Sequence, residues 1–230
     1  MNLSARKQFY LQSMGIDIYQ SRRHETGSVQ ESFGSDVNLI RSFNGSDWEQ
    51  LQQQVSGCTL CELHRSRTQT VFGVGNTAAD WMIIGEAPGA DEDRQGEPFV
   101  GRAGKLLNNM LLAIGLEREQ VFIANILKCR PPNNRDPAPD EVTKCEPYLN
   151  KQIEMIAPSI ILAVGRVAAQ NLLKIDTPIG KMRGQRYTHP ATGIPVVVTY
   201  HPAYLLRSPR EKRKVWEDLK LAQQVYQERT

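Results

Sequence analysis

Four short, largely apolar runs, separated by longer amphipathic stretches, constrain the fold of this chain more than any other feature. Each run is continuously apolar instead of alternating with polar residues, which is typical of strands buried on both faces. The runs are Trp81–Gly85, Val121–Asn125, Ile160–Val164 and Val196–Tyr200. The stretches at 104–114, 139–156 and 166–174 carry apolar residues at helical spacing. Strands that alternate with helices predict an α/β fold, in which a parallel sheet with right-handed crossovers lies between helical layers.

By composition the chain divides into a short N-terminal part and a longer body. Serine, glycine, asparagine and charged residues dominate residues 21–46, so we predict a flexible N-terminal extension over residues 1–45. Within it, an apolar and aromatic island at 10–19 predicts a docking peptide, at about residues 8–20, for a replication or repair protein. Residues 46–230 are long enough to form one domain with a well-buried core.

Hydropathy and charge narrow the class of protein. The longest apolar stretch, Ile160–Val164, is far too short to span a bilayer, so we expect a soluble, cytoplasmic protein with no membrane partner. Although the net charge is only +3, basic residues cluster in three loops. Such clusters suit a polyanion if folding gathers them on one face, and solvated surface charge is the alternative. The clusters are Lys128, Arg130 and Arg135; Lys181, Arg183 and Arg186; and Arg207, Arg210, Lys212, Arg213 and Lys214.

All four cysteines fall into two groups, Cys58-x2-Cys61 and Cys129-x15-Cys145. Thiolates two residues apart can reach one metal centre from a single turn, and the distant pair completes the coordination once the intervening chain has folded. The spacing fits a four-cysteine zinc site and an iron–sulfur cluster equally well. Disulfides are a weaker alternative, because the chain shows no signal segment and we expect it to meet reducing thiols. Either metal site would tie residues 58–61 to residues 129–145.

A polar side chain follows three of the four predicted strands. Glu86 lies in a glycine- and proline-rich loop after the first strand, Asn125 ends the second, and His201 follows the fourth. Each alone would be an ordinary loop or turn residue, but ligands collect where the carboxyl ends of parallel strands converge. The P-loop and dinucleotide fingerprints both fail, because Gly73-x-Gly75 precedes its strand and no Gly-Lys-Ser/Thr occurs. The three side chains therefore predict a site of another kind.

Four motifs are specific enough to indicate a family. They are Gly85-Glu-Ala-Pro-Gly-Ala-Asp-Glu-Asp93, Glu97-Pro-Phe-Val-Gly101, Asn125-Ile-Leu-Lys-Cys-Arg-Pro-Pro132 and His201-Pro-Ala-Tyr-Leu-Leu206. In this order they closely resemble the family 4 uracil-DNA glycosylases, the iron–sulfur branch of that superfamily. The resemblance extends from about Gly57 into the C-terminal helix and leaves residues 1–45 outside it. It implies a three-layer α/β/α sandwich with a central four-stranded parallel sheet.

The resemblance also implies an activity, a cofactor and a partner. The expected enzyme is a DNA glycosylase of base excision repair, a hydrolase that cleaves the N-glycosidic bond of deoxyuridine in DNA, releases uracil and leaves an abasic site. Its partner would be uracil-containing DNA, single- or double-stranded, and it would act as a monomer. A [4Fe–4S] cluster would be held by Cys58, Cys61, Cys129 and Cys145. The flipped uracil would be bound by Gly85, Glu86, Ala87, Phe99, Asn125 and His201.

Each of these positions suits a step of glycosidic hydrolysis. Phe99 would stack on the flipped base, with core filling as the alternative, and Asn125 would read the uracil edge with one donor and one acceptor. His201 would stabilise the negative charge that develops on the departing base. Glu86 would oppose positive charge on the sugar or orient the attacking water. Better-known branches place an aspartate where this chain has Ala87, so their water-activating residue cannot be transferred.

Contacts with the rest of the DNA are predicted next to His201 and after the second strand. Leu205 and Leu206 are expected to be exposed and to fill the gap left by the flipped base, with burial in the core as the alternative. Arg207 would then meet a phosphate. Arg130 would bind DNA from the loop that follows Cys129.

Two other functions stay open at this point. One is a uracil-DNA-binding protein of the same fold that traps its substrate through a covalent histidine. That branch carries a basic, histidine-containing insertion after the second strand, whereas this chain has no histidine between His64 and His189. The other is a non-catalytic iron–sulfur or zinc module recruited through the N-terminal peptide. Release of free uracil, formation of a stable adduct, or neither would separate the three.

Overall fold

The computed structural model describes residues 48–229, so the extension and the docking peptide predicted for residues 1–45 lie outside it. At its centre is a six-stranded sheet in the order β1-β3-β2-β4-β6-β5. The strands are β1 (Val74–Gly75), β2 (Trp81–Gly85), β3 (Phe122–Asn125), β4 (Ile160–Val164), β5 (Arg186–Thr188) and β6 (Pro195–Thr199). The four inner strands are parallel, and β1 and β5 pair antiparallel at the edges. The predicted four-stranded parallel sheet is therefore present, with one short strand added at each edge.

Helices connect the parallel strands, as the alternating pattern predicts. Those expected at 104–114, 139–156 and 166–174 correspond to α5, α6 and α7. The α-helices of the described range are α3 (Trp48–Ser56), α4 (Ala90–Gln95), α5 (Arg102–Ala113), α6 (Pro139–Ile156), α7 (Arg166–Leu173), α8 (Ile179–Met182), α9 (Pro202–Arg207) and α10 (Lys212–Gln227). Within residues 48–229, no helix has the length and apolar character that crossing a membrane requires.

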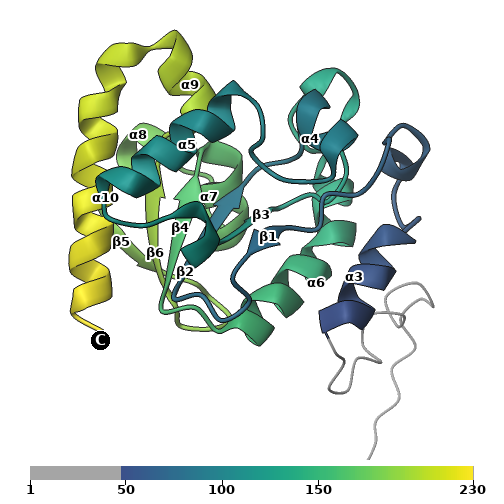
Figure 1. The fold of residues 1–230 in the computed structure, drawn as a ribbon, viewed down its shortest axis with the longest axis horizontal. Helices are drawn as coiled ribbons and strands as arrows, with labels where there is room; N and C mark the ends of the chain where they lie inside the picture. The colour runs from purple at the N-terminus through teal and green to yellow at the C-terminus, as the bar shows by residue number, and fades with distance from the viewer. Residues whose placement is uncertain (1–47, 230) are drawn as a thin grey trace, which may run out of the picture. The chain divides into compact units, whose positions relative to one another are not determined.

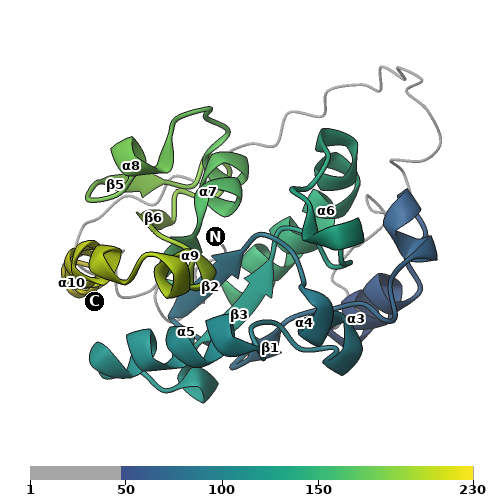
Figure 2. The same ribbon diagram turned by 90° about the horizontal axis from the view of Figure 1, so that it is seen from above.

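The helices cover both faces of the sheet, which makes the domain a three-layer α/β/α sandwich (Figures 1 and 2). Figure 2 separates α5 and α10, on one side of the sheet, from α6 and α7 on the other. Ile83 of β2 and Leu162 of β4 belong to the same buried cluster as Leu111 of α5 and Leu219 of α10. Because side chains of both faces are covered, the inner strands can be apolar at every position.

The carboxyl ends of the parallel strands place the predicted polar residues together. Gly85 at the end of β2 is the register partner of Asn125 at the end of β3. The pairing continues past both strands, because the backbone N–H of Leu127 donates to the Glu86 carbonyl at 3.0 Å. His201 follows β6 and caps α9, and α4 and α9 lie at the same end of the sheet (Figure 1). The carboxyl-terminal end of the sheet thus carries all three side chains.

Candidate active site

A cavity of about 460 Å³ opens at the carboxyl ends of β2, β3 and β6. Its volume falls in the range of small-molecule sites in proteins. Most of the residues predicted for uracil binding or catalysis line this one cavity, at the strand ends where the sequence analysis expected a ligand site. The predicted residues at its wall are Glu86, Ala87, Phe99, Asn125, His201 and Arg207, and Asp136 and Tyr204 join them.

Gly85 lies under the cavity and leaves room for two of those residues. A Cβ atom at this position would lie 2.5 Å from Asn125 Oδ1 and 2.6 Å from Phe99 Cζ. Both distances are far inside normal van der Waals contact, so a side chain here would displace the carboxamide, the ring or both. The glycine is required because it allows these two groups to approach the backbone closely.

Asn125 presents an unused hydrogen-bond acceptor to the cavity. Its side chain is only 2% exposed, and among residues 48–229 its Oδ1 atom has no hydrogen-bond partner. A buried polar atom without a partner costs free energy, and at a cavity wall a ligand can complete the missing bond. The carboxamide also offers two N–H donors, and it can therefore recognise a group that presents a donor beside an acceptor.

Phe99 is held in a backbone conformation that bulky residues rarely adopt, with φ at 55°. Two neighbours fix it. Gly104 lets α5 approach so closely that a Cβ there would lie 1.7 Å from the Phe99 carbonyl oxygen. The Arg118 guanidinium donates to the Pro98 carbonyl at 2.6 Å and, more weakly, to the Phe99 carbonyl at 3.4 Å. The ring both packs into the core cluster and lines the cavity, so its core packing does not remove it from the cavity wall.

The Phe99 ring also stacks on the imidazole of His201, with centroids 5.5 Å apart and planes 29° from parallel. The hydrogen bonds define the tautomer of that imidazole. The backbone N–H of Ala203 donates to His201 Nδ1 at 3.2 Å, so Nδ1 is an acceptor and the ring proton of the neutral form sits on Nε2. Burial, aided by the positive charge of Arg207, lowers the pKa of His201 to about 4. At neutral pH the ring is therefore uncharged and offers one N–H donor, at Nε2.

Glu86 is the one cavity carboxyl whose pKa is strongly raised. Burial, assisted by the carboxylate of Asp136 and opposed by the guanidinium of Arg166, raises the pKa of Glu86 to about 7. Arg166 itself forms an ion pair with Asp136 at 2.5 Å. Near neutral pH, Glu86 can therefore exist in either protonation state, a property common to catalytic carboxyl groups.

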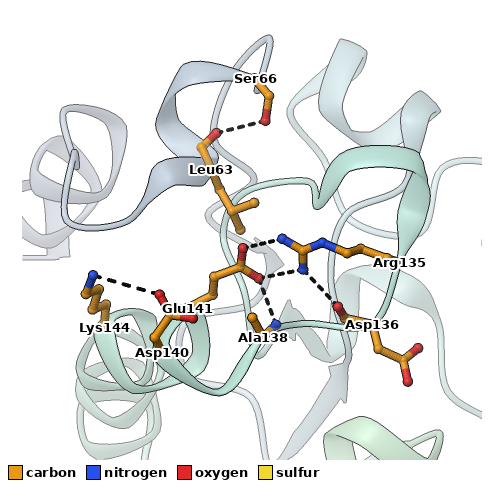
Figure 3. A network of polar contacts seen from close by, with 8 residues as sticks. All are labelled: Leu63, Ser66, Arg135, Asp136, Ala138, Asp140, Glu141 and Lys144. Atoms are coloured by element: carbon orange, nitrogen blue, oxygen red, sulfur yellow. Dashed lines mark hydrogen bonds and ion pairs between the residues drawn. The ribbon is translucent and has the colours of Figure 1, made fainter.

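Two loops around the cavity are held by carboxylates that the sequence analysis did not single out. Glu92 accepts from the backbone N–H groups of Gly89 and Val100, at 3.1 Å and 3.0 Å, and so joins the loop after β2 to the loop that carries Phe99. Glu92 belongs to a motif quoted above, which was the signal that could have indicated it. On the other side, Figure 3 shows Glu141 paired with Arg135, at 2.6 Å in its shortest contact, beside Asp136.

The predicted DNA contacts are only partly supported by their exposure. Leu205 is 1% exposed and packs into the core cluster, so the prediction that it forms part of a wedge is wrong. The reason is the helical geometry of α9, which turns consecutive residues by about 100° and leaves Leu206 37% exposed. Arg207 reaches the cavity wall, and Arg130 lies in its loop with its Nε donating to Asn134 Oδ1 at 2.8 Å.

Two of the predicted basic clusters contain a residue whose charged group is bound by other parts of the protein. Lys128 is 1% exposed, so its expected place in a basic surface cluster that could meet a polyanion is wrong. Arg183 donates to both carboxylate oxygens of Asp218, at 3.0 Å and 2.8 Å, and lies over the Tyr200 ring. These partners come from distant parts of the chain, so charge spacing along the sequence could not reveal them.

All four cysteines are free and line a second, small cavity next to α6. Two nitrogen donors already point at their sulfur atoms. The Arg67 guanidinium donates to Cys129 Sγ at 3.1 Å, and the backbone N–H of Lys128 donates to Cys145 Sγ at 3.3 Å. Burial raises the pKa of the Cys61 and Cys129 thiols and raises that of Cys145 to about 12. Such thiols ionise only with compensation, and bound metal provides it.

The chemistry of the donors in this second cavity fits a metal group. Within residues 48–229, no three histidine, cysteine, aspartate or glutamate side chains are grouped closely enough to hold a single ion. Four free thiols line the cavity, and N–H donors are directed at two of their sulfur atoms. This donor set fits a metal group held by thiolates.

Comparison with known proteins agrees with this fold. The family model of the uracil DNA glycosylase superfamily matches residues 72–220. A type-4 uracil-DNA glycosylase of Archaeoglobus fulgidus is 47% identical over 178 residues, which cover 75% of this chain and 89% of that protein. The type-4 enzyme of Sulfurisphaera tokodaii is 46% identical over 179 residues, covering 75% and 81% of the two chains. That of Saccharolobus solfataricus is 47% identical over 178 residues, covering 74% and 82%. The chain belongs to the uracil-DNA glycosylase superfamily and, within it, to the type-4 family.

Proposed function

We propose that this protein is a uracil-DNA glycosylase, which hydrolyses the bond between uracil N1 and the deoxyribose and so initiates base excision repair. It releases free uracil and leaves an abasic site in single- or double-stranded DNA. The relatives that share about half of its residues carry this activity in their names. The observation that carries the proposal is the unpaired Oδ1 of Asn125, buried at the end of β3 and facing a cavity of base-binding size.

Uracil is the base that satisfies this carboxamide. Its N3–H donates to Asn125 Oδ1, and its O4 accepts from the Asn125 side-chain N–H, so both groups of the amide are paired. Cytosine presents an acceptor and a donor in the opposite order and would leave buried polar atoms unpaired. The ring of the flipped base lies against Phe99, which replaces stacking lost from the DNA at about 1–3 kcal/mol.

Cleavage places negative charge on the departing uracil, and His201 is positioned to receive it. The neutral ring donates from Nε2, because Nδ1 accepts from Ala203. A fixed N–H directed at uracil O2 strengthens its bond as the oxygen becomes anionic, so it stabilises the transition state more than the bound substrate. Glu86 and Ala87 line the same cavity.

Cleavage also leaves positive charge on the sugar, and Glu86 is the residue that opposes it. As an anion, Glu86 stabilises an oxocarbenium-like sugar or orients the water that attacks it. Its pKa near 7 means that the anion becomes the dominant form above neutral pH. The Arg166–Asp136 pair lies beside this carboxyl and sets part of its pKa.

The second cavity is proposed to hold a [4Fe–4S] cluster through Cys58, Cys61, Cys129 and Cys145. When bound, the cluster supplies four iron–thiolate bonds that cross-link the chain, whereas the hydrolysis itself moves no electrons. Arg67 and the backbone of Lys128 would stabilise the sulfur atoms of Cys129 and Cys145 by donated hydrogen bonds.

The test is excision from an oligonucleotide that contains one uracil. The protein should release free uracil and leave an alkali-labile site, and it should not act on the same oligonucleotide with thymine. Asn125→Ala should reduce kcat/KM at least about 100-fold, because a site built around a hydrogen bond loses most when that bond is absent. Asn109→Ala, on the exposed side of α5, is the matched control. Failure of the wild-type protein to release uracil would refute the proposal, and a stable protein–DNA adduct would favour a trapping protein.

A further inference from the structure

Lys128 is fully buried, and the site described so far assigns it no role. Its side chain extends back from the segment after β3, and its Nζ donates to the backbone carbonyl of Asn125 at 3.0 Å. The same Nζ donates to Gln152 Oε1 at 2.6 Å. Gln152, on α6, is completely buried and donates in turn to the Phe72 carbonyl at 3.0 Å. Lys128 therefore contacts the backbone of Asn125 without lining the cavity that Asn125 lines.

The segment from Asn125 to Cys129 joins the two cavities within five residues. At one end, the N–H groups of Ile126 and Leu127 donate to the carbonyls of Gly85 and Glu86, both at 3.0 Å. At the other end, the backbone of Lys128 donates to Cys145 Sγ. The lysine side chain returns across this segment and closes it by an i to i+3 bond. Asn125, which carries the unpaired Oδ1, is therefore followed by two backbone hydrogen bonds to the Gly85–Glu86 segment. Its own carbonyl accepts from the Lys128 ammonium group.

Burying an ammonium group is costly, and an apolar side chain of similar length would pack at lower cost. The cost is offset only where the ammonium satisfies acceptors that would otherwise be left unpaired. Here those acceptors are the Asn125 carbonyl and Gln152 Oε1. A carboxamide discriminates between bases only if its own position is fixed to a fraction of an ångström, and a lysine tied at both ends provides that constraint.

We propose that Lys128 is a positioning residue for uracil recognition, which fixes Asn125 through its carbonyl and is itself fixed by Gln152. The proposal rests on the proposed function, in which Asn125 reads the uracil edge. It assigns Lys128 no contact with substrate. Its loss should therefore weaken the recognition of uracil while leaving contacts with the DNA backbone intact.

The experiment compares two ligands on one set of variants. One ligand is a short single strand that carries 2′-fluoro-2′-deoxyuridine, whose glycosidic bond resists cleavage. The other is the same strand with a tetrahydrofuran abasic analogue in place of that nucleotide. Lys128→Met keeps the length of the side chain but removes its donors, and Gln152→Met removes the other partner. Lys151→Met is the matched control. It replaces a lysine by methionine next to Gln152 on α6, at a position where the lysine pairs with Glu154.

Lys128→Met should weaken binding of the fluorinated strand about tenfold, which corresponds to about 1.4 kcal/mol, and should change binding of the abasic strand less than twofold. Gln152→Met should show the same pattern with a loss of about threefold. The double variant should lose no more than Lys128→Met alone, because the two residues act through one contact. Lys151→Met should bind both strands as the wild type does.

Equal losses on the two strands would overturn the proposal, as would unchanged binding of the fluorinated strand. Iron content and visible absorbance are measured on every preparation. Both should match the wild type, because the backbone N–H that meets Cys145 Sγ remains in Lys128→Met. If that variant does not fold, Gln152→Met decides the matter. Failure of the proposed function looks different: Asn125→Ala would then bind both strands as the wild type does.

Discussion

The two cavities of this protein are lined by residues only a few positions apart in the chain, but they differ in which hydrogen-bonding groups lack a partner. At the base-binding cavity, Asn125 Oδ1 is unpaired and the His201 Nε2–H remains available for a ligand. At the cysteine cavity, donors from Arg67 and Lys128 already point at sulfur, and burial opposes ionisation of the thiols. The first suits a ligand that binds and leaves, whereas the cluster proposed for the second would stay bound. Substitutions in the two should therefore fail in different ways.

The largest effect should come from the cysteine cavity and should appear as lost stability. Cys145→Ser removes one ligand of the proposed cluster, and a cross-link that closes a long loop contributes about 3 kcal/mol or more to the free energy of unfolding. We expect the visible absorbance to disappear and the denaturant midpoint to fall. Removing iron from the wild-type protein with a chelator should produce the same loss. Unchanged iron content and stability would show that these thiols hold no structural cluster.

In the base-binding cavity, the largest effect should come from His201→Ala and should appear in the rate. Loss of one donor to a developing oxyanion reduces catalysis about 100- to 1,000-fold. Single-turnover excision should slow by this factor while the melting temperature stays close to that of the wild type. A rate within tenfold of the wild type would remove His201 from the proposed mechanism.

Glu86→Gln should slow excision about 100-fold, because the amide cannot oppose the positive charge of the sugar. Binding of a strand that carries 2′-fluoro-2′-deoxyuridine should be retained, since Gln has nearly the same shape. Glu217→Gln, the same substitution at an exposed position on α10 that does not line the cavity, is the matched control. Wild-type rates for Glu86→Gln would exclude a catalytic role for this carboxyl.

The pH dependence should report the same carboxyl with a smaller effect. The pKa of Glu86 is raised to about 7, so acidification protonates it and the rate should fall about tenfold for each pH unit below that value. His201 should add no change to the pH–rate profile near neutrality, because its pKa is lowered to about 4. The raised pKa has the opposite consequence for stability: Glu86 disfavours the folded state as pH rises from about 4.5 to about 7. A wild-type profile that is flat between about pH 8 and pH 6 would contradict this assignment.

The smallest effect should come from the exposed side chain beside the cavity. Leu206→Ala should slow excision from duplex DNA about fivefold and change the rate on single strands little, because only the duplex has a gap to fill. Leu112→Ala, another exposed leucine, on α5, is the matched control. Equal losses on both substrates would remove the wedge role.

The sequence predicted the sheet well because its inner strands are buried on both faces and so are apolar throughout. It predicted Trp81–Gly85 and Ile160–Val164 to the residue. The edge strands β1 and β5 span only two and three residues, too few to show a pattern. The site residues at strand ends were predictable because the carboxyl ends of parallel strands lie on the same side of the sheet.

The errors arose where packing, and not local pattern, decides exposure. Leu205 and Leu206 look alike in sequence, and only the orientation of α9 separates them. Lys128 is charged, and its burial depends on Gln152, more than twenty residues away in the chain. The pairing of Asp136 with Arg166 likewise joins a loop to the start of α7, and no spacing rule connects the two.

The uncharged state of His201 has a consequence for inhibitors. A neutral N–H distinguishes the intact base from the departing one only by how strongly O2 accepts a hydrogen bond. Molecules designed against this cavity should therefore gain more from a strong, correctly placed acceptor in that position than from a formal negative charge. A charged analogue would lose its hydration on entering a buried cavity, and the imidazole would offer it no opposite charge in return.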